Sequence, residues 1–121
     1  MHVLLIDDDP DIRMLAGFVL EAAGHRVSVA ESGAAGIALA AGAYDLVLLD
    51  YRLGDMTGAE VLPALIEAAP TRPVVLLTGT EDPEATGGLL DAGAAAVVTK
   101  PFDPEALAGR IEHILRSVRE S

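Results

Sequence analysis

The chain contains no cysteine among its 121 residues. This absence excludes disulfide scaffolds, thiolate metal sites and thiol nucleophiles, and it fits a reducing compartment. Basic residues are also scarce, because 8 Lys and Arg residues stand against 19 Asp and Glu residues, for a formal net charge of -11. Since the basic residues never cluster, the chain lacks an electrostatic footprint for a phosphate backbone. We expect no direct binding of nucleic acid.

Long apolar segments are missing as well. No apolar run approaches the roughly 18 residues of a membrane-spanning helix, and the chain opens without the basic region and apolar stretch of a signal peptide. We therefore expect a cytoplasmic protein that does not bind membranes. The length fits one domain with a single core, and neither a repeat nor a linker divides it. The prediction is one domain over residues 1–121, with no output domain in this chain.

Four short apolar runs each lead into polar residues that can handle a phosphoryl group or a metal ion. The runs are 3–6, 46–49, 74–77 and 96–98, and the polar residues beyond them are Asp7 with Asp8, Asp50, Thr78 and, after Thr99, Lys100. Runs of this length are typical of buried parallel strands. Open α/β sheets place their ligand crevice just beyond the carboxyl ends of such strands. We expect these five side chains to converge on one spot.

Segments with helical periodicity separate the apolar runs. Asp9, Asp82 and Asp103 each precede a proline, as at many helix starts, and Ser32 and the capping box of Thr57 and Glu60 mark two more. The predicted strands are 2–6, 26–30, 45–50, 73–78 and 96–99, and the predicted helices are 10–23, 33–42, 58–69, 83–92 and 104–118. Strict alternation indicates an α/β fold: a flavodoxin-like, doubly wound sheet of five parallel strands with helices on both faces.

Asp7, Asp8 and Asp50 bring three carboxylates into the predicted crevice. Carboxylates held this close repel one another unless a cation offsets their charge. Oxygen ligands without His or Cys favour Mg²⁺ or Mn²⁺, and a few carboxylates completed by water suit Mg²⁺ best. A solvated loop would explain Asp7 and Asp8 alone, but their position opposite Asp50 favours a metal. Asp9 and Asp11 are expected to cap and begin the following helix instead.

A carboxylate at the end of a buried strand can attack phosphorus, so Asp50 is the candidate phosphoacceptor. The transferred group spreads negative charge over three oxygens, which a cation, an ammonium group and hydrogen-bond donors can neutralise. Lys100 and Thr78 supply the ammonium and the hydroxyl. Singly, a strand threonine and a surface lysine have structural explanations, and only their joint placement makes them specific. The bond from Lys100 to Pro101 is a tertiary amide that can be cis and aim the ammonium inward.

With these positions, the chain resembles a response-regulator receiver domain of two-component signalling. The matching segments are LLIDDDPDIR, YDLVLLDYRLGDMTGAEVL, VVLLTG and DAGAAAVVTKPFDPEAL. The resemblance covers essentially all of the chain and implies a signalling phosphoacceptor, not an enzyme, with Asp50 phosphorylated by a sensor histidine kinase or a histidine phosphotransfer protein. The implied Mg²⁺ ligands are Asp7 or Asp8, Asp50 and the backbone carbonyl of Arg52, and Thr78 and Lys100 would contact the phosphoryl oxygens.

Several positions depart from the family's pattern. Val97 stands where the family has a switch aromatic, so ring rotation cannot be the readout, and Gly54 replaces a common proline and loosens the loop after Asp50. Ala95 and Ala96 replace the acidic pair of receivers that dimerise through salt bridges. We also consider a phosphorylation-driven homodimer through Leu89, Leu90, Ala95 and Val97. Arg52 and Thr80 occupy positions that tune phosphoryl lifetime in the family.

The helix over 10–23 carries a candidate docking surface. Its predicted buried stripe consists of Ile12, Leu15, Ala16, Val19, Leu20 and Ala23. Met14 and Phe18 lie off this stripe, four residues apart, and are predicted to be exposed. Single exposed apolar residues are common, but a Met and a Phe at helical spacing beside a crevice indicate docking of a partner helix.

Two alternatives remain at this point. The segment 6–9 also resembles the Asp-x-Asp signature of haloacid-dehalogenase-type phosphatases, with Asp7 as nucleophile and Asp9 as acid and base. That alternative leaves Asp50 unexplained and lacks the expected second acidic pair near the end. A pseudo-receiver would keep the fold and signal by binding alone, but the presence of all five site residues argues against it.

Overall fold

The computed structural model describes residues 1–79 and 83–120. Strands and helices alternate in the predicted order: β1 His2–Ile6, α1 Pro10–Ala22, β2 Arg26–Ala30, α2 Gly33–Leu39, β3 Leu46–Asp50, α3 Gly58–Ala68, β4 Val74–Thr78, α4 Pro83–Asp91, β5 Ala96–Thr99 and α5 Pro104–Glu120. Every predicted element is confirmed, although α2 is shorter and α5 longer than expected. The predicted cap at Asp82 and the position Thr80 lie outside the described residues.

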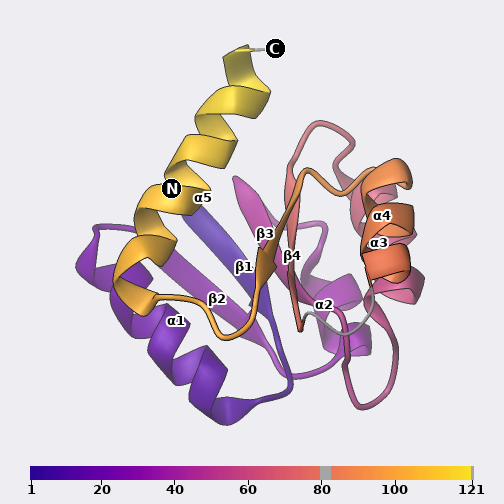
Figure 1. Cartoon of the computed structure of the whole chain (residues 1–121), viewed down its shortest axis with the longest axis horizontal. Helices are drawn as coiled ribbons and strands as arrows, with labels where there is room; N and C mark the ends of the chain where they lie inside the picture. The colour runs from indigo at the N-terminus through magenta and orange to yellow at the C-terminus, as the bar shows by residue number, and fades with distance from the viewer. Residues whose placement is uncertain (80–82, 121) are drawn as a thin grey trace.

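The strands form one parallel sheet in the order β2-β1-β3-β4-β5. Helices α1 and α5 cover one face, and α2, α3 and α4 cover the other (Figure 1). This is the predicted doubly wound α/β architecture. Because the strands are parallel, their carboxyl ends share one edge of the sheet, where Asp7 after β1, Asp50 at the end of β3 and Lys100 after β5 come together.

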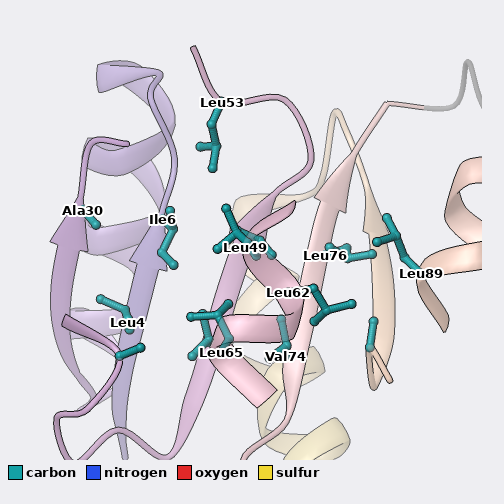
Figure 2. Close-up of a cluster of buried hydrophobic side chains, with 14 residues drawn as sticks. Leu4, Ile6, Ala30, Leu49, Leu53, Leu62, Leu65, Val74, Leu76 and Leu89 are labelled. Carbon is teal, nitrogen blue, oxygen red and sulfur yellow. The ribbon is translucent and has the colours of Figure 1, made fainter. Parts of the chain in front are cut away.

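Alternation of side chains along the strands divides the core into two layers. In β1, Leu4 and Ile6 face the layer under α2, α3 and α4, whereas Val3 and Leu5 face α1 and α5. Figure 2 shows the first layer, in which leucines of the central strands meet leucines of α3. Each fully buried Leu or Val contributes about 1.5–3 kcal/mol. This packing fixes the strand ends that carry the polar residues.

Local capping agrees with the sequence signals. The Asp9 side chain accepts a hydrogen bond from the Asp11 amide at 2.9 Å and caps α1. Ser32 caps α2, and Thr57 forms the predicted capping box with Glu60 at the start of α3. These side chains satisfy amide groups that have no partner inside the helix. Asp9 and Asp11 therefore have the structural roles expected of them.

The stripe predicted for α1 was too wide. Ile12, Ala16, Val19 and Leu20 turn inward, but Leu15 is 40% exposed and Ala23 lies just beyond the helix end, also exposed. A helix that packs on one sheet and one neighbouring helix covers only part of its circumference, so residues at the border of the apolar stripe stay in solvent. Leu15 therefore adds to the exposed apolar surface of this helix.

The assignment of Leu89 to the considered dimer surface was also wrong. Leu89 is 5% exposed and packs in the core layer under α4, so it cannot contact a second copy without unpacking that layer. Leu90 is 44% exposed, and Val97 is half-buried against the same layer. Of the four residues considered, Leu90 and Ala95 are therefore the exposed ones. None of the helices in the described part of the chain has the length and apolar character needed to cross a membrane.

Candidate functional site

The carboxyl edge of the sheet carries a crevice of about 440 Å³. Its lining includes three of the predicted side chains, Asp50, Thr78 and Lys100. They come from the ends of β3 and β4 and from the residue after β5. The other lining residues are Ile12, Tyr51, Arg52, Gly79 and Pro101. Ile12 brings the start of α1 to the same crevice, so the site is built from four separate segments.

Three carboxylates meet beside this crevice. One oxygen from each of Asp7, Asp8 and Asp50 lies within 4.8 Å of the others. Asp7 is fully buried and Asp50 is 7% exposed, whereas Asp8 faces solvent. The Asp9 amide donates to Asp7 Oδ1 at 2.9 Å and holds that carboxylate in place. A set of hard oxygens with one side open to water suits a divalent cation such as Mg²⁺.

Lys100 bridges two of these carboxylates. Its Nζ lies 3.2 Å from Asp7 Oδ2 and 3.2 Å from Asp50 Oδ1. Burial acts to lower the pKa of Lys100, but the carboxylates of Asp50 and Asp7 outweigh burial and raise it. The ammonium group therefore stays charged inside the site. The peptide bond from Lys100 to Pro101 is cis, as the sequence allowed.

Asp50 has an unusual charge environment for an aspartate. Burial, and next the charge of Asp7, raise the pKa of Asp50 from 3.8 to about 6, although Lys100 and the Arg52 amide oppose the shift. At pH 7 the group is still mostly ionised, and it is more basic than an ordinary aspartate. A second cation near Asp50 would favour the carboxylate further.

Thr78 and Arg52 also line the crevice, and both were predicted as site residues. The Thr78 hydroxyl donates to the carbonyl of Gly79 at 3.2 Å and lines the crevice. The Arg52 amide lies 3.4 Å from Asp50 Oδ1, and Arg52 pairs with Thr57 in an isolated antiparallel bridge. The loop after Asp50 therefore turns back on itself beside the site.

Two charged residues near the site were missed by the sequence analysis. Arg13 on α1 donates to the backbone carbonyl of Asp7 at 2.9 Å and lies 3.7 Å from a carboxylate oxygen of Glu31. Asp55 accepts hydrogen bonds from the amides of Gly33 and Ala34 at 2.9 and 3.0 Å. A charged residue on a helix or in a loop is usually solvated. Only the long-range contacts distinguish these two.

The candidate docking residues on α1 are exposed as predicted. Met14 is 71% exposed and Phe18 is 72% exposed. Leu15, whose predicted burial was wrong, extends this surface, which we call the α1 apolar surface and define as Met14, Leu15 and Phe18. Large exposed apolar patches mark contact sites for other proteins, whereas single exposed apolar residues are common.

Comparison with known proteins decides the family. Residues 3–112 match the family model described as the response regulator receiver domain. The chain belongs to the response-regulator receiver family. Among solved structures it is similar to a CheY-like receiver domain protein from Methanospirillum hungatei, with a TM-score of 0.92, 30% identity and coverage of 98% of this chain and 96% of that one. It is also similar to the beryllofluoride-activated DrrB receiver domain, with a TM-score of 0.84, 32% identity and coverage of 95% and 97%.

Curated relatives of the receiver are longer proteins. An uncharacterized transcriptional regulatory protein, YkoG of Bacillus subtilis, is 40% identical over 117 residues, which cover 95% of this chain and 51% of the relative. The transcriptional regulatory protein GlrR of Escherichia coli is 37% identical over 121 residues, covering 94% of this chain and 26% of the relative. The chain thus spans about half or a quarter of the length of these relatives.

Family membership establishes the general function. The chain is a receiver domain of two-component signalling, the class whose members act as phosphoacceptors, and such a domain implies a histidine kinase as partner. Receiver domains bind Mg²⁺ at an acidic pocket, and this chain has a carboxylate cluster of that kind. The haloacid-dehalogenase alternative loses its basis, because the matched family is one of signalling domains and Asp9 caps α1.

Proposed function

We propose that Asp50 accepts a phosphoryl group from a phosphohistidine of a sensor histidine kinase or a histidine phosphotransfer protein. The observation that carries this proposal is Lys100, which lies 3.2 Å from both Asp50 and Asp7 within the carboxylate cluster. A carboxylate oxygen of Asp50 attacks phosphorus, the bond from phosphorus to the imidazole nitrogen breaks, and the imidazole keeps the electron pair. The product is an aspartyl phosphate.

The residues around Asp50 have separate tasks in this step. The ammonium of Lys100 neutralises charge that develops on the phosphoryl oxygens, and its contact with Asp50 Oδ1 at 3.2 Å supports this role. The Thr78 hydroxyl, which donates to the Gly79 carbonyl, is free to rotate toward a phosphoryl oxygen instead. Gly79 has no side chain to obstruct an incoming donor. The crevice between Thr78 and Lys100 is where that donor would enter.

The carboxylate cluster fits Mg²⁺, with Mn²⁺ as the alternative. We propose Asp7 or Asp8, Asp50 and the backbone carbonyl of Arg52 as its ligands, because these groups are hard oxygens close to the acceptor. When bound, the ion supplies positive charge that offsets the carboxylates and the transferred group. Lys100 supplies the remaining positive charge, since it contacts two of the same carboxylates.

Beryllofluoride provides the most direct test of Asp50 as the acceptor. In the presence of Mg²⁺ it should bind the Asp50 carboxylate as a phosphoryl mimic and shift the NMR signals of Thr78, Lys100 and α5. Acetyl phosphate should add one phosphoryl group by intact mass. Asp50→Asn should abolish both responses, because an amide oxygen is too weak a nucleophile. No modification and no shift in the unmodified chain would instead support the pseudo-receiver.

The α1 apolar surface is the proposed docking site for the phosphodonor. Met14 and Phe18 lie on the helix that also brings Ile12 to the crevice, so a partner helix packed on them would lie close to Asp50. Apolar contact of this kind supplies affinity, while the carboxylate cluster receives the phosphohistidine. This surface would recognise the helical bundle of a histidine kinase or phosphotransfer protein.

Replacing both Met14 and Phe18 by alanine should slow phosphotransfer from the kinase by about tenfold or more, since truncated interface anchors often cost at least 1 kcal/mol each. The kinase to use is the one from the source organism that phosphorylates the unmodified chain fastest. Modification by acetyl phosphate should be unchanged, because a small donor needs no docking surface. Val29→Ala is the matched control, an exposed apolar residue on β2. Equal transfer rates in the double variant and the control would contradict docking on α1.

The output of the switch is proposed to leave through the face formed by α4, β5 and α5. Val97 lies on this face and packs against the core, so a movement of Thr78 would have to be transmitted by packing and not by rotation of an aromatic ring. The receiver would act on a separate target protein or on a further domain, as the greater length of the transcriptional regulators allows. A homodimer on the same face would depend on Leu90 and Ala95.

A further inference from the structure

The loop after Asp50 is a short hairpin. Arg52 and Thr57 pair in an antiparallel bridge, and the Leu53 amide donates to the Met56 carbonyl at 3.1 Å. Gly54 and Asp55 form its tip. We call residues 51–57 the β3–α3 hairpin. It carries the carbonyl of Arg52, the backbone group proposed as a metal ligand, so its position decides where that oxygen lies.

The tip of this hairpin is attached to the start of α2. Asp55 Oδ1 accepts from the Gly33 amide at 2.9 Å, and Asp55 Oδ2 accepts from the Ala34 amide at 3.0 Å. Backbone hydrogen bonds, that from Ala34 first, lower the pKa of Asp55 and keep it ionised. The next amide, of Ala35, is bound by Ser32. Each of the first three amides of α2 thus has an acceptor, and two of these bonds belong to the hairpin.

Packing around the tip supports the same attachment. A Cβ atom on Gly33 would lie 2.9 Å from Met56 Sδ, so the hairpin rests directly on the α2 backbone. On the other side, a Cβ atom on Gly54 would lie 3.7 Å from Asp8 Oδ2. The tip therefore lies between the start of α2 and one carboxylate of the cluster. Gly54 does little to restrict the hairpin by itself, so its order must come from these contacts.

We infer that Asp55 is a positioning residue for the metal site. Its two hydrogen bonds to α2 hold the β3–α3 hairpin, and with it the Arg52 carbonyl, in place. Asp55 itself does not bind the ion; it acts through the hairpin. This role rests on the proposed function, because it matters only if a divalent ion binds at the carboxylate cluster. A residue that orients metal ligands in this way contributes to affinity without contacting the metal.

The test is the Mg²⁺ affinity of the full chain, measured by calorimetry and by amide NMR shifts. Asp55→Ala should weaken Mg²⁺ binding on the order of tenfold, the lower end of losses seen when ligand-orienting residues are removed. The Mg²⁺ affinity of Asp55→Asn should fall between those of Asp55→Ala and the unmodified chain, since the amide oxygen of asparagine can still accept one hydrogen bond. Ser32→Ala is the matched control, because it removes an acceptor from the same helix end and leaves the hairpin attached. Its Mg²⁺ affinity should be unchanged.

Three results would overturn the role. Mg²⁺ affinity in Asp55→Ala equal to that of the unmodified chain would show that the hairpin needs no attachment, and an equal loss in Ser32→Ala would trace the effect to α2. A loss that disappears at about 1 M salt, where the Debye length is about 3 Å, would show that only the charge of Asp55 matters. Failure of the unmodified chain to bind Mg²⁺ would instead overturn the proposed function, and this role with it. Circular dichroism of each variant identifies any that fail to fold, and Asp55→Asn then provides the comparison.

Discussion

Asp50→Asn should stabilise the receiver by about 2 kcal/mol at pH 7 without Mg²⁺, while removing its ability to be phosphorylated. The reason is that the folded protein holds Asp50 in an unfavourable place for a negative charge, since burial and the charge of Asp7 raise the pKa of Asp50 to about 6. A neutral amide of the same shape avoids that cost and can still accept a hydrogen bond from Lys100. Functional sites often hold such unfavourable charge.

The pH dependence of this gain follows from proton binding. Between the ordinary pKa of 3.8 and the raised pKa of about 6 for Asp50, the folded state binds more protons than the unfolded state. The contribution of Asp50 to stability therefore falls as the pH rises through this window and stays low above it. Each pKa unit is worth about 1.4 kcal/mol, so the full effect is about 3 kcal/mol. An asparagine recovers only part of it, because its amide group packs and forms hydrogen bonds differently from a protonated aspartate.

Urea unfolding of Asp50→Asn and the unmodified chain at about pH 4 and at pH 7 measures the effect. The two proteins should have similar stability near pH 4 and differ at pH 7. Mg²⁺ should narrow the difference by stabilising the unmodified chain more than the variant, which lacks one of the proposed ligands. Asp45→Asn is the control. Asp45 lies far from the carboxylate cluster and binds Arg119 and the His2 amide, so loss of its negative charge should lower the stability of the protein. A destabilised Asp50→Asn at pH 7 would contradict the proposed charge strain.

Arg72→Ala should lower the free energy of unfolding by about 3 kcal/mol. Arg72 is 8% exposed and donates to the carbonyls of Ala40, Gly42 and Leu65 at 2.9, 3.3 and 3.4 Å. These carbonyls lie at or near the ends of α2 and α3, where the helix dipole favours a positive charge. Removal of the guanidinium leaves them without this donor and opens a cavity in a buried place.

The loss should be confined to stability. Arg72 lies at the amino edge of the sheet, just before β4, whereas Asp50 lies at the carboxyl edge, so modification by acetyl phosphate should be unchanged. Arg119→Ala is the matched control, since the Arg119 side chain is 63% exposed and pairs with Asp45 on the surface. It should cost less than about 1 kcal/mol. Equal midpoints for both variants in urea would show that the buried guanidinium adds no stability.

The fold could be predicted because its signals are local. Apolar runs of three or four residues placed four of the five strands, helical repeats placed the segments between them, and capping residues such as Thr57 placed helix starts within the described chain. The early end of α2 at Leu39 was not predicted. The Arg72 guanidinium donates hydrogen bonds to the carbonyls of Ala40 and Gly42, so a residue distant in sequence binds the segment where the helix ends.

Burial at the borders of apolar stripes could not be predicted as reliably. The helical period places Leu15 at the edge of the apolar stripe of α1, next to the buried Ala16. It does not show how much of the helix surface the neighbouring elements cover. Leu89 and Leu90 follow two glycines, and their order alone does not indicate which of them turns inward. Side-chain coverage is decided by the packing of several elements, so it appears only in the folded chain.

The sequence alone determined where the strands end and which polar residues stand there. These positions predicted the parallel sheet, the convergence of Asp7, Asp50 and Lys100, and the family. The electrostatic and hydrogen-bond energies of the site were decided only by the tertiary structure. The raised pKa of Asp50, the double contact of Lys100 and the attachment of Asp55 to α2 each join residues distant in sequence. Electrostatic energies and hydrogen bonds depend on separation and burial, and these are set only when the helices close over the sheet.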